Sequence, residues 1–312
     1  MINPILVETN FDNLGKLIRG KVRDVYEQES QLLLVTTDRH SSFDRNIAHI
    51  PHKGAILTQM SMFWFEQTKD IIPNHIIAQP DPNVVVVKKC TLLPIEVIVR
   101  GYLTGVTSTS IWKNYSDGKR DFGDFMLPDG MVKNQALEEN VVTPTTKLEE
   151  HDRNLTSDDI ISEGLLSQEH WDYVSSTAKK LFLCGQEIAA KAGYILVDTK
   201  YEFGMDQEEN ILLIDEVHTP DSSRYWKMDS YQERIAEGQE PENFDKEFLR
   251  LWFKENCDPY NDEVLPAAPE ELILELSRRY KEIYNQITGQ EFSEETGDIL
   301  ARMESNLTSY TL

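Results

Sequence analysis

The sequence predicts an α+β fold in which antiparallel strands come first along the chain and helices dominate its end. Three observations support this expectation. Strand-like segments fill the first third, a helical periodicity and a second hairpin follow in the middle, and the chain from about Asp229 to Gln286 is mainly helical in pattern. Strands and helices in separate parts of a chain are typical of α+β proteins rather than of a doubly wound parallel sheet.

Two pairs of strands are expected in the first third of the chain. Residues 16–26 and 32–37 have strand-like composition and are joined by the polar turn Glu27–Gln31. Val84–Lys89 and Ile95–Val99 are predicted to form another pair.

A helix is expected over Ala55–Thr68, directly after Gly54, because its apolar residues recur at helical spacing. This segment contains a dense group of methionine and aromatic side chains, which core packing explains better than a cofactor site does. The group consists of Met60, Met62, Phe63 and Trp64.

The middle of the chain combines an irregular segment with a helix and a hairpin. Residues 114–140 are rich in glycine and charge, which suggests a surface excursion or a lid. A helix is predicted over roughly Gln168–Ala192, followed by Gly193 where a C-cap glycine belongs. The strands Tyr194–Phe203 and Asn210–Asp215 form the predicted hairpin.

The chain is long enough for two modest domains that share a cleft, because it has 312 residues. We predict an N-terminal antiparallel-sheet domain over residues 1–98. Residues 99–312 are predicted to form a larger α+β domain with a helical C-terminal part.

The composition excludes some classes of partner. The formal net charge of −23 would repel long nucleic acids and anionic membranes. A small phosphorylated substrate is not excluded, because a local cluster of Arg and Lys can reverse the potential inside one cleft. No apolar run approaches the roughly 20 residues that span a bilayer, and the N-terminus lacks the pattern of a signal peptide.

The cysteines and histidines give no metal-binding or nucleophile signature. Cys90, Cys184 and Cys257 are few, odd in number and widely separated, so they are expected to be reduced thiols of a cytoplasmic protein. His151 and His218 lie in polar segments that could belong to an active site.

The hairpin at residues 194–215 has the clearest chemical pattern. Alternate residues of a strand share a face, so Asp198, Lys200 and Glu202 are expected to project together. Asp215 ends the returning strand, so it could meet Glu202 with Lys200 beside them. Two close carboxylates are hard oxygen ligands suited to Mg²⁺ that bridges nucleotide phosphates, although a solvated hairpin face would have the same spacing.

Two further segments could bind phosphate or carboxylate groups. Gly20 is followed by the alternating cations Lys21 and Arg23, which on a β-turn could cover a triphosphate, although the segment is not a Walker loop. Arg100 closes a strand beside glycines and hydroxyls, where its guanidinium could bind an anion bidentately. Cations on a solvent face and a surface salt bridge are the competing interpretations.

Six motifs follow one another in a specific order between about Leu14 and Trp226. They are GKVRDVYE, TTDRHSSFD, VIVRGYLTG, PTTKLEEHD, ILVDTKYEFG and IDEVHTPDSSRYW. Together and in this order they resemble the succinocarboxamide synthase family over two-thirds of the chain. The helical C-terminal part is less diagnostic.

The resemblance implies an ATP site in the cleft between a smaller antiparallel N-terminal domain, kinase-like in outline, and the larger α+β domain. Gly20, Lys21 and Arg23 would lie over the phosphates. Leu92 and its neighbours would form the connection that contacts adenine.

The resemblance also assigns metal-associated and substrate-binding positions. Glu202 and Asp215 match the acidic residues associated with Mg²⁺, and with Lys200 they are expected to be catalytic. The positions expected to line the pocket for the imidazole nucleotide are Ser42, Arg100, Lys200, Asp221 and Arg224.

Two details of the resemblance leave alternatives open. The PTTKLEEHD segment, with Thr146, Lys147, His151 and Asp152, is expected on the aspartate or the nucleotide side. Some family members read TGS after the arginine motif, whereas this chain reads TGVTSTSIW. The substrate serine is therefore Ser110, preceded by a four-residue insertion, or Ser108; the Ile-Trp-Lys that follows favours Ser110.

The activity implied by the resemblance is an ADP-forming ligase of purine biosynthesis. It would use ATP to join L-aspartate to carboxylated aminoimidazole ribonucleotide, through attack of the nucleotide carboxylate on the γ-phosphate and displacement of phosphate by the aspartate amine. We expect no nucleic-acid or membrane partner, and a monomer or homodimer.

Two other classes of protein remain as alternatives. A small-molecule kinase would share the ATP half but would leave the phosphate on its substrate. A non-catalytic nucleotide-binding protein would tolerate loss of the acidic pair.

Overall fold

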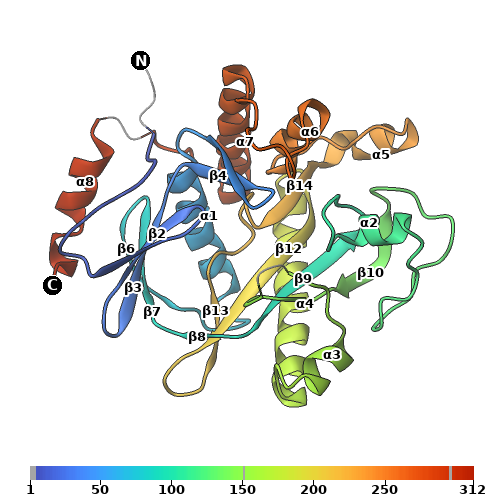
Figure 1. The fold of residues 1–312 in the computed structure, drawn as a ribbon, viewed down its shortest axis with the longest axis horizontal. Coiled ribbons are helices and arrows are strands. Elements are labelled where there is room, and N and C mark those ends of the chain that lie inside the picture. Colours follow the sequence, from blue (N-terminus) through green and yellow to red (C-terminus); the bar gives the residue numbers. More distant parts are fainter. Residues whose placement is uncertain (1–4, 150–151, 295–296) are drawn as a thin grey trace.

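The protein has two antiparallel sheets with helices packed against them, which confirms the predicted α+β class (Figure 1). The structure is a computed structural model, in which residues 5–149, 152–294 and 297–312 are described. In that part of the chain no helix is both long enough and apolar enough to cross a membrane.

The first sheet has five strands in the order β1-β2-β3-β7-β6. One expectation was wrong here, because the predicted strand 16–26 is two strands. Gly20 donates its backbone N–H to the carbonyl of Arg23 at 2.8 Å, which closes a turn in the middle of the segment. The strands are β1 (Lys16–Arg19), β2 (Arg23–Glu27), β3 (Gln31–Thr36), β6 (Ile76–Asp81) and β7 (Val84–Lys88).

The predicted pairing of residues 84–89 with 95–99 was also wrong. Strand β7 pairs with β3 on one edge and with β6 on the other. Because both edges of β7 are already hydrogen-bonded, the segment at residues 95–99 has no free edge there, and as part of β9 (Ile95–Tyr102) it joins the second sheet.

Strand β12 (Tyr194–Met205) is the centre of the second sheet. It pairs with β13 (Ile211–Ile214), which confirms the predicted hairpin. Its first half pairs with β9 and with β14 (Ser223–Lys227), and its second half pairs with β13 and with β8 (Thr91–Leu92). The shorter elements beside β9 are β10 (Ala136–Val142) and β11 (Thr145–Thr146), and a separate hairpin consists of β4 (Arg39–Ser42) and β5 (Arg45–His49).

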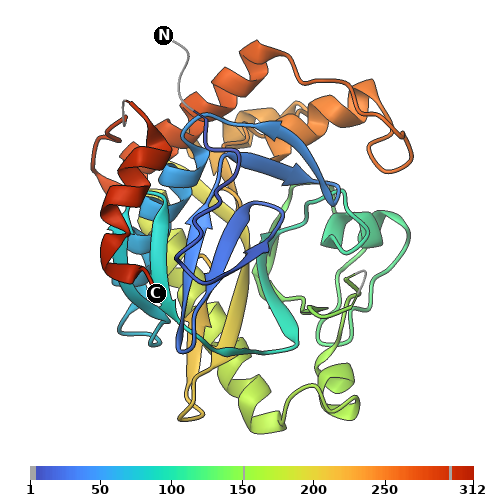
Figure 2. The same ribbon diagram turned by 60° about the vertical axis from the view of Figure 1, so that its left-hand side comes forward.

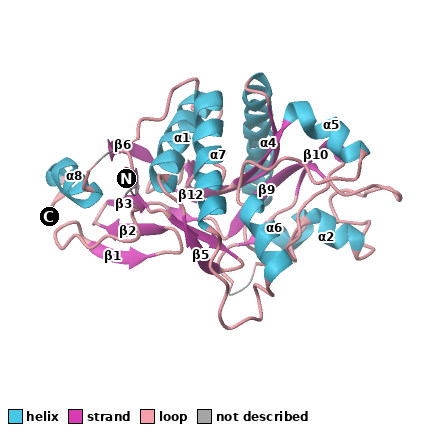
Figure 3. Ribbon diagram, turned by 90° about the horizontal axis from the view of Figure 1, so that it is seen from above, coloured by secondary structure: helices cyan, strands magenta, loops and turns pink. Residues whose placement is uncertain are grey.

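Helices cover the sheets and contribute many of the buried residues of the main core. The predicted helices are confirmed as α1 (Lys53–Thr68) and α4 (Gln168–Lys191), the latter followed by Gly193 at φ 83°. Met60 and Trp64 are fully buried in the main core, which confirms their packing role. Helix α1 lies beside α7 (Figure 3). The other helices are α2 (Ile111–Ser116), α3 (Ser157–Ser162), α5 (Met228–Ala236), α6 (Glu247–Asn256), α7 (Glu270–Thr288) and α8 (Ile299–Asn306), before a 3₁₀ turn at Thr308–Tyr310.

The segment 114–140 runs from the end of α2 to β10 at the edge of the molecule, with an irregular loop between them (Figure 1). It is therefore a surface excursion, as one of the two expectations stated. The lid role stays a prediction.

Helix α8 returns to the first sheet, where Figure 2 shows it beside the N-terminal strands. Met303 and Leu307 are buried against Leu33 and Val84 of that sheet. Arg302 pairs with Asp81 at 2.9 Å. The division into domains at residues 98 and 99 stays a prediction, and the packing of α8 adds a C-terminal layer to the N-terminal sheet.

We predict that Met303→Ala lowers the free energy of unfolding by about 2 to 4 kcal/mol, because it removes a fully buried side chain between α8 and the first sheet. Leu300→Ala on the same helix is the control, since Leu300 is 42% exposed and its loss should cost within about 0.5 kcal/mol. Denaturant unfolding measures both. Equal losses in the two variants would contradict the packing of α8 described here.

Candidate active site

A cavity of about 270 Å³ opens beside the central strand β12. Charged and hydroxyl side chains dominate its walls, so it suits a polar, ionised ligand rather than an apolar one. The lining residues include Glu96, Arg100, Thr107, Thr109, Ser110, Thr145, Asp152, Asp198, Lys200, Asp221, Ser222, Ser223, Arg224, Asp245, Lys246 and Arg250.

Sheet register places two arginines on either side of one aspartate. Asp198 of β12 is the cross-strand neighbour of Arg100 on β9 and of Arg224 on β14. Arg100 Nη1 lies 3.2 Å and Arg224 Nη1 lies 2.6 Å from Asp198 Oδ2. Arg100 Nε also donates to Thr143 Oγ1 at 2.7 Å. Arg224 Nη2 also lies 3.7 Å from Glu247 Oε2, so a second carboxylate balances the charge of this wall.

Both arginines are cations at neutral pH although both are buried. Burial lowers the pKa of Arg100 to about 10, partly offset by Asp198. Burial acts in the same direction on Arg224, but attraction to Asp198 and Glu247 outweighs it and raises the pKa. The Nε of Arg224 is buried and has no hydrogen-bond partner among the described residues. A guanidinium N–H without a partner, beside a second arginine, can donate to a phosphate or carboxylate.

A second cationic wall surrounds Asp221. Lys53 Nζ of α1 lies 3.1 Å and Lys246 Nζ lies 2.9 Å from the same oxygen, Oδ2 of Asp221. The Asp221 side chain is 1% exposed. Burial alone would raise the pKa of Asp221, but attraction to Lys246 and Lys53 lowers it. Arg250, one turn beyond Lys246, donates its Nε to Ser42 Oγ at 3.2 Å.

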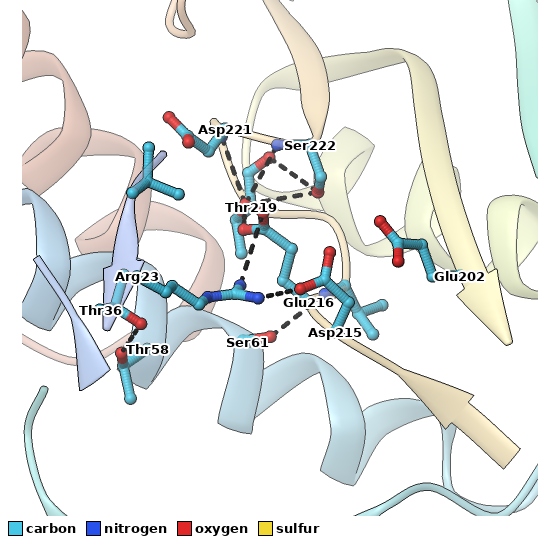
Figure 4. Close-up of polar contacts among 12 residues, drawn as sticks. Arg23, Thr36, Thr58, Ser61, Glu202, Asp215, Glu216, Thr219, Asp221 and Ser222 are labelled. Atoms are coloured by element: carbon cyan, nitrogen blue, oxygen red, sulfur yellow. Dashed lines mark hydrogen bonds and ion pairs between the residues drawn. The ribbon is translucent and has the colours of Figure 1, made fainter. Parts of the chain in front are cut away.

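A third group of charges lies where β9, β12 and the end of β13 meet, and Figure 4 shows two of its members, Glu202 and Asp215. Lys200 Nζ forms an ion pair with Glu202, lies 3.3 Å from Glu96 Oε1 and lies 3.6 Å from Asp215 Oδ2. Lys147 Nζ contacts Glu96 at 2.9 Å and Glu202 at 2.6 Å. Glu202 and Asp215 therefore meet with Lys200 between them, as the sequence predicted.

The cations of this third group keep Glu202 ionised. Burial would raise the pKa of Glu202, but Lys200 and Lys147 lower it to about 2. For Lys200, burial would lower the pKa, and attraction to Glu202 and Glu96 raises it.

Arg23 links the first sheet to this group. It forms an ion pair with Asp215, and its Nη2 lies 3.6 Å from Glu216 Oε1 (Figure 4). Beside Arg23, a cavity of about 10 Å³ lies between the first sheet and α1. That space is about the least that can hold one water molecule. Its apolar walls include Leu34, Leu57, Met62, Phe65, Ile76 and Val85.

The predicted site residues fall into two groups in the structure. Arg100, Ser110, Lys200, Asp221 and Arg224 line the main cavity, Glu202 and Asp215 lie beside Lys200, Arg23 contacts Asp215, and Ser42 contacts Arg250. Three predicted residues lie apart from this network, namely Gly20, Lys21 and Leu92.

The residues outside the network lie on exposed turns or connections. Lys21 contacts Asp44 at 2.5 Å, with its side chain 62% exposed. Leu92 is 45% exposed on β8, in the connection between the two sheets. Ser108 is exposed, whereas Ser110 is 1% exposed.

The PTTKLEEHD segment reaches the site at several points. Thr145 and Asp152 line the main cavity, and Lys147 contacts Glu96 and Glu202. Thr146 is buried beside them on β11. His151 lies outside the described residues.

His218 does not line the cavity. Its side chain is fully buried, and burial lowers the pKa of the imidazole to about 3. His218 was expected in a polar segment that could belong to an active site. The segment reaches the cavity at Asp221 and Ser222, but the side chain of His218 lies in the core.

Sequence reasoning missed several charged residues of the site. Lys246 and Arg250 have helical i, i+4 spacing, which could have identified a cationic helix face. Glu216 follows Asp215 directly. Lys53 and Glu96 had no local signal, because only the tertiary fold brings them to Asp221 and Lys200.

A family profile and the relatives found by sequence comparison name the same enzyme. A family profile described as SAICAR synthetase matches residues 16–267. The chain is 56% identical over 287 residues to the phosphoribosylaminoimidazole-succinocarboxamide synthase of Legionella pneumophila (strain Paris), covering 92% of each. It is 54% identical over 288 residues to the chloroplastic enzyme of that name from Arabidopsis thaliana, covering 91% of this chain and 70% of the relative.

Solved structures agree with these relatives. A SAICAR synthase from Saccharomyces cerevisiae complexed with SAICAR is similar with a TM-score of 0.78 and 33% identity, covering 92% of this chain and 99% of that chain. A SAICAR synthetase in complex with ADP is similar with a TM-score of 0.68 and 25% identity, covering 89% of this chain and 100% of that chain.

We predict that Glu202 stabilises the fold in a pH-dependent way. Its pKa in the folded state is about 2, below the ordinary 4.5, so its contribution is complete above about pH 5 and is lost as the pH falls toward about 2. The difference in unfolding free energy between the wild type and Glu202→Gln should shrink by about 1 to 2 kcal/mol between about pH 5.5 and pH 3.

Denaturant titrations across this pH range measure the difference. Glu208→Gln, in the exposed turn of the same hairpin, controls for the amide substitution itself. A difference for Glu202→Gln that stays constant with pH would show that the ion pairs with Lys200 and Lys147 do not hold in solution.

Proposed function

Since this chain belongs to the SAICAR synthetase family, we propose how its cavity carries out the family's reaction. The protein is an ATP-dependent amide ligase of purine biosynthesis that joins L-aspartate to 5-amino-1-(5-phosphoribosyl)imidazole-4-carboxylate and releases ADP and phosphate. One observation supports the assignment of roles. The two cationic walls, around Asp198 and around Asp221, border the same cavity as the third group of charges around Lys200.

The chemistry explains why so many cations line the cavity. A carboxylate and an amine do not condense in water until the carboxylate oxygen becomes a leaving group. The nucleotide carboxylate attacks the γ-phosphorus, an O–P bond forms, and the bond to the β–γ bridging oxygen breaks to release ADP. The aspartate amine then attacks the acyl carbon, loses a proton, and expels phosphate as the C–O bond breaks. Each step gathers anionic groups that fixed positive charges stabilise.

The imidazole nucleotide is assigned to the two cationic walls. Arg100 and Arg224 both contact Asp198, and the buried Nε of Arg224 has no partner among the described residues, which suits a phosphate or carboxylate. Ser110 borders the same space. Lys246 and Arg250 offer a second anion position on the far side of Asp221, so the two walls can hold the two anionic ends of one nucleotide.

ATP is assigned to the junction between the first sheet and β12. Arg23 contacts Asp215 there, and Gly20 and Lys21 form the turn above it. Val25, Leu34 and Val87 form an apolar sheet face suited to a nucleobase, and the connection that contains Leu92 continues from the end of β7. The present cavity is too small for adenine, so Arg23 and its neighbours must move before a nucleobase can bind there.

Glu202 and Asp215 are the residues proposed to hold Mg²⁺. Among the described residues no three acidic, histidine or cysteine side chains converge on one metal position. That fits Mg²⁺, which is usually held by one or two carboxylates together with substrate phosphates. The chemistry supplied by the ion when bound is neutralisation of phosphate charge.

L-Aspartate is assigned to the side of the cavity formed by Thr145, Lys147 and Asp152. Burial raises the pKa of Asp152, which suits a carboxylate that accepts the proton released by the amine. Lys147 supplies a cation for an aspartate carboxylate.

Location and assembly remain proposals. A cytoplasmic site fits three cysteines that form no disulfide, whereas plant relatives are named chloroplastic. A monomer or a homodimer is proposed for the assembly.

The test of the function is phosphate release from Mg-ATP with the carboxylated aminoimidazole nucleotide, with and without L-aspartate. Release that requires both substrates, with amide product formed, is the expected result. Phosphate retained on an acceptor would identify a kinase, and ATP binding without turnover would identify a non-catalytic protein.

We predict that Lys200→Ala and Asp215→Asn each abolish ligation without unfolding the protein. Loss of one preorganised charged contact typically lowers the rate by about 10²- to 10³-fold. Lys180→Ala, at an exposed position on α4, is the control and should keep full activity. Near-normal turnover in either site variant, with circular dichroism like that of the wild type, removes that residue from the site.

We predict that Ser110→Ala raises KM for the imidazole nucleotide by about 10-fold or more, because it removes a hydroxyl of the cavity wall. In the structure this hydroxyl donates to the Thr107 carbonyl at 2.7 Å, and rotation about its C–O bond would let it donate to a charged ligand group instead. Ser108→Ala should leave KM unchanged, since Ser108 is exposed and lies outside the cavity lining. Steady-state kinetics with the nucleotide varied decides between the two serines. The opposite ranking would place the substrate serine at Ser108.

A further inference from the structure

The loop between β13 and β14 connects the two halves of the site. At its start, Asp215 and Glu216 contact Arg23 of the first sheet (Figure 4). At its end, Asp221 and Ser222 line the main cavity, and Arg224 follows on β14. The position of this loop therefore sets the distance between the groups assigned to ATP and those assigned to the imidazole nucleotide.

The loop is internally cross-linked by Thr219 (Figure 4). Its hydroxyl forms a hydrogen bond with Glu216, and it accepts the backbone N–H groups of Asp221 and Ser222 at 3.3 Å each. These bonds tie the start of the loop to its end. A displacement at its middle would consequently move both ends together.

The middle of the loop is held by His218, which is fully buried and lies at φ 47°. Its Nε2 contacts the hydroxyl of Tyr201 on β12. Its carbonyl accepts the hydroxyl of Tyr225 on β14 at 2.5 Å. Its ring packs edge-on against Trp64 of α1 at a centroid distance of 4.7 Å. Three elements of the core thus fix one loop residue in a backbone conformation that is uncommon for a non-glycine residue.

Helix α4 closes the fourth side of this pocket with Gly185. A Cβ added at Gly185 would lie 2.5 Å from Cε1 and 2.8 Å from Nδ1 of His218. It would also lie 2.7 Å from Cδ2 of Leu196. Gly185 faces the core side of His218, so even a methyl group there would push against the imidazole.

We propose that His218 is a positioning residue that sets the alignment of the two substrates by holding the loop between β13 and β14. The effect on catalysis rests on the proposed function, whereas the fixed position of the loop rests on the packing around His218. His218 touches neither cavity, so its effect is on the placement of Asp215, Asp221 and their neighbours rather than on direct binding.

The test uses Gly185→Ala, which acts on His218 from the side away from the cavity. We expect kcat to fall by about 10-fold. A displacement of the loop by up to about 1 Å would misalign the reacting groups of the two substrates, and such misalignment lowers the rate. KM for Mg-ATP and for the carboxylated nucleotide should change by less than about threefold, since each ligand keeps its own contacts. The rate is expressed per ADP-binding site measured by calorimetry, so that a loss of folded protein does not count as a loss of kcat.

A mutant cycle identifies the route of the effect. In a His218→Ala background, the contact with the imidazole is gone and the methyl group meets only the flexible end of Leu196, so Gly185→Ala should change kcat by less than about twofold. In a Leu196→Ala background, Gly185→Ala should still lower kcat, because the contact with His218 remains. Additive losses with His218→Ala, or rescue by Leu196→Ala, would overturn the proposal.

Hydrogen exchange of peptides that contain residues 215–222 gives a readout independent of ligation. Gly185→Ala should accelerate exchange there, and Leu196→Ala should not. If the wild type forms no amide product, the proposed function fails while this comparison still decides the role of His218. Wild-type kcat and unchanged exchange in Gly185→Ala would refute that role.

Discussion

The balance of charge along strand β12 is the constraint on which the site depends. Asp198 shares one carboxylate between Arg100 and Arg224, and two residues further on Lys200 shares one ammonium group among carboxylates. Isolated ions at this depth would be strongly destabilised. Because each partner is held by strand pairing with β12, the sheet keeps these charges in place before any substrate arrives.

This arrangement explains how an acidic protein can accept acidic substrates. The net charge of −23 describes the whole surface, whereas the cavity concentrates cations from strands, from α1 and from the start of α6. Some of those cations are neutralised by Asp198 and Asp221 in the structure. Substrate phosphates and carboxylates can compete with or add to these internal anions, so the site is prepared for negative charge without having an unpaired cationic surface.

Much of the fold and site could be predicted where a local pattern specifies the structure. The alternation in β12 placed Asp198, Lys200 and Glu202 together, and the apolar periodicity located α1 and α4. The predictions failed where pairing depends on a competing partner. Strand β7 pairs with β6 rather than with β9, and the turn at Gly20 divides what reads as one strand. Helix α8 had no expected role, although it covers the first sheet.

The sequence by itself determined which residue types could perform the chemistry and, through the order of the motifs, which family they resemble. The tertiary structure alone decided which of them meet. Lys53 reaches Asp221 across 168 positions of the chain, and His218, in a polar segment, faces the core instead of the cavity. The physical reason is that a local pattern fixes the direction of a side chain relative to its own strand or helix, whereas contacts between distant elements depend on how the whole core packs.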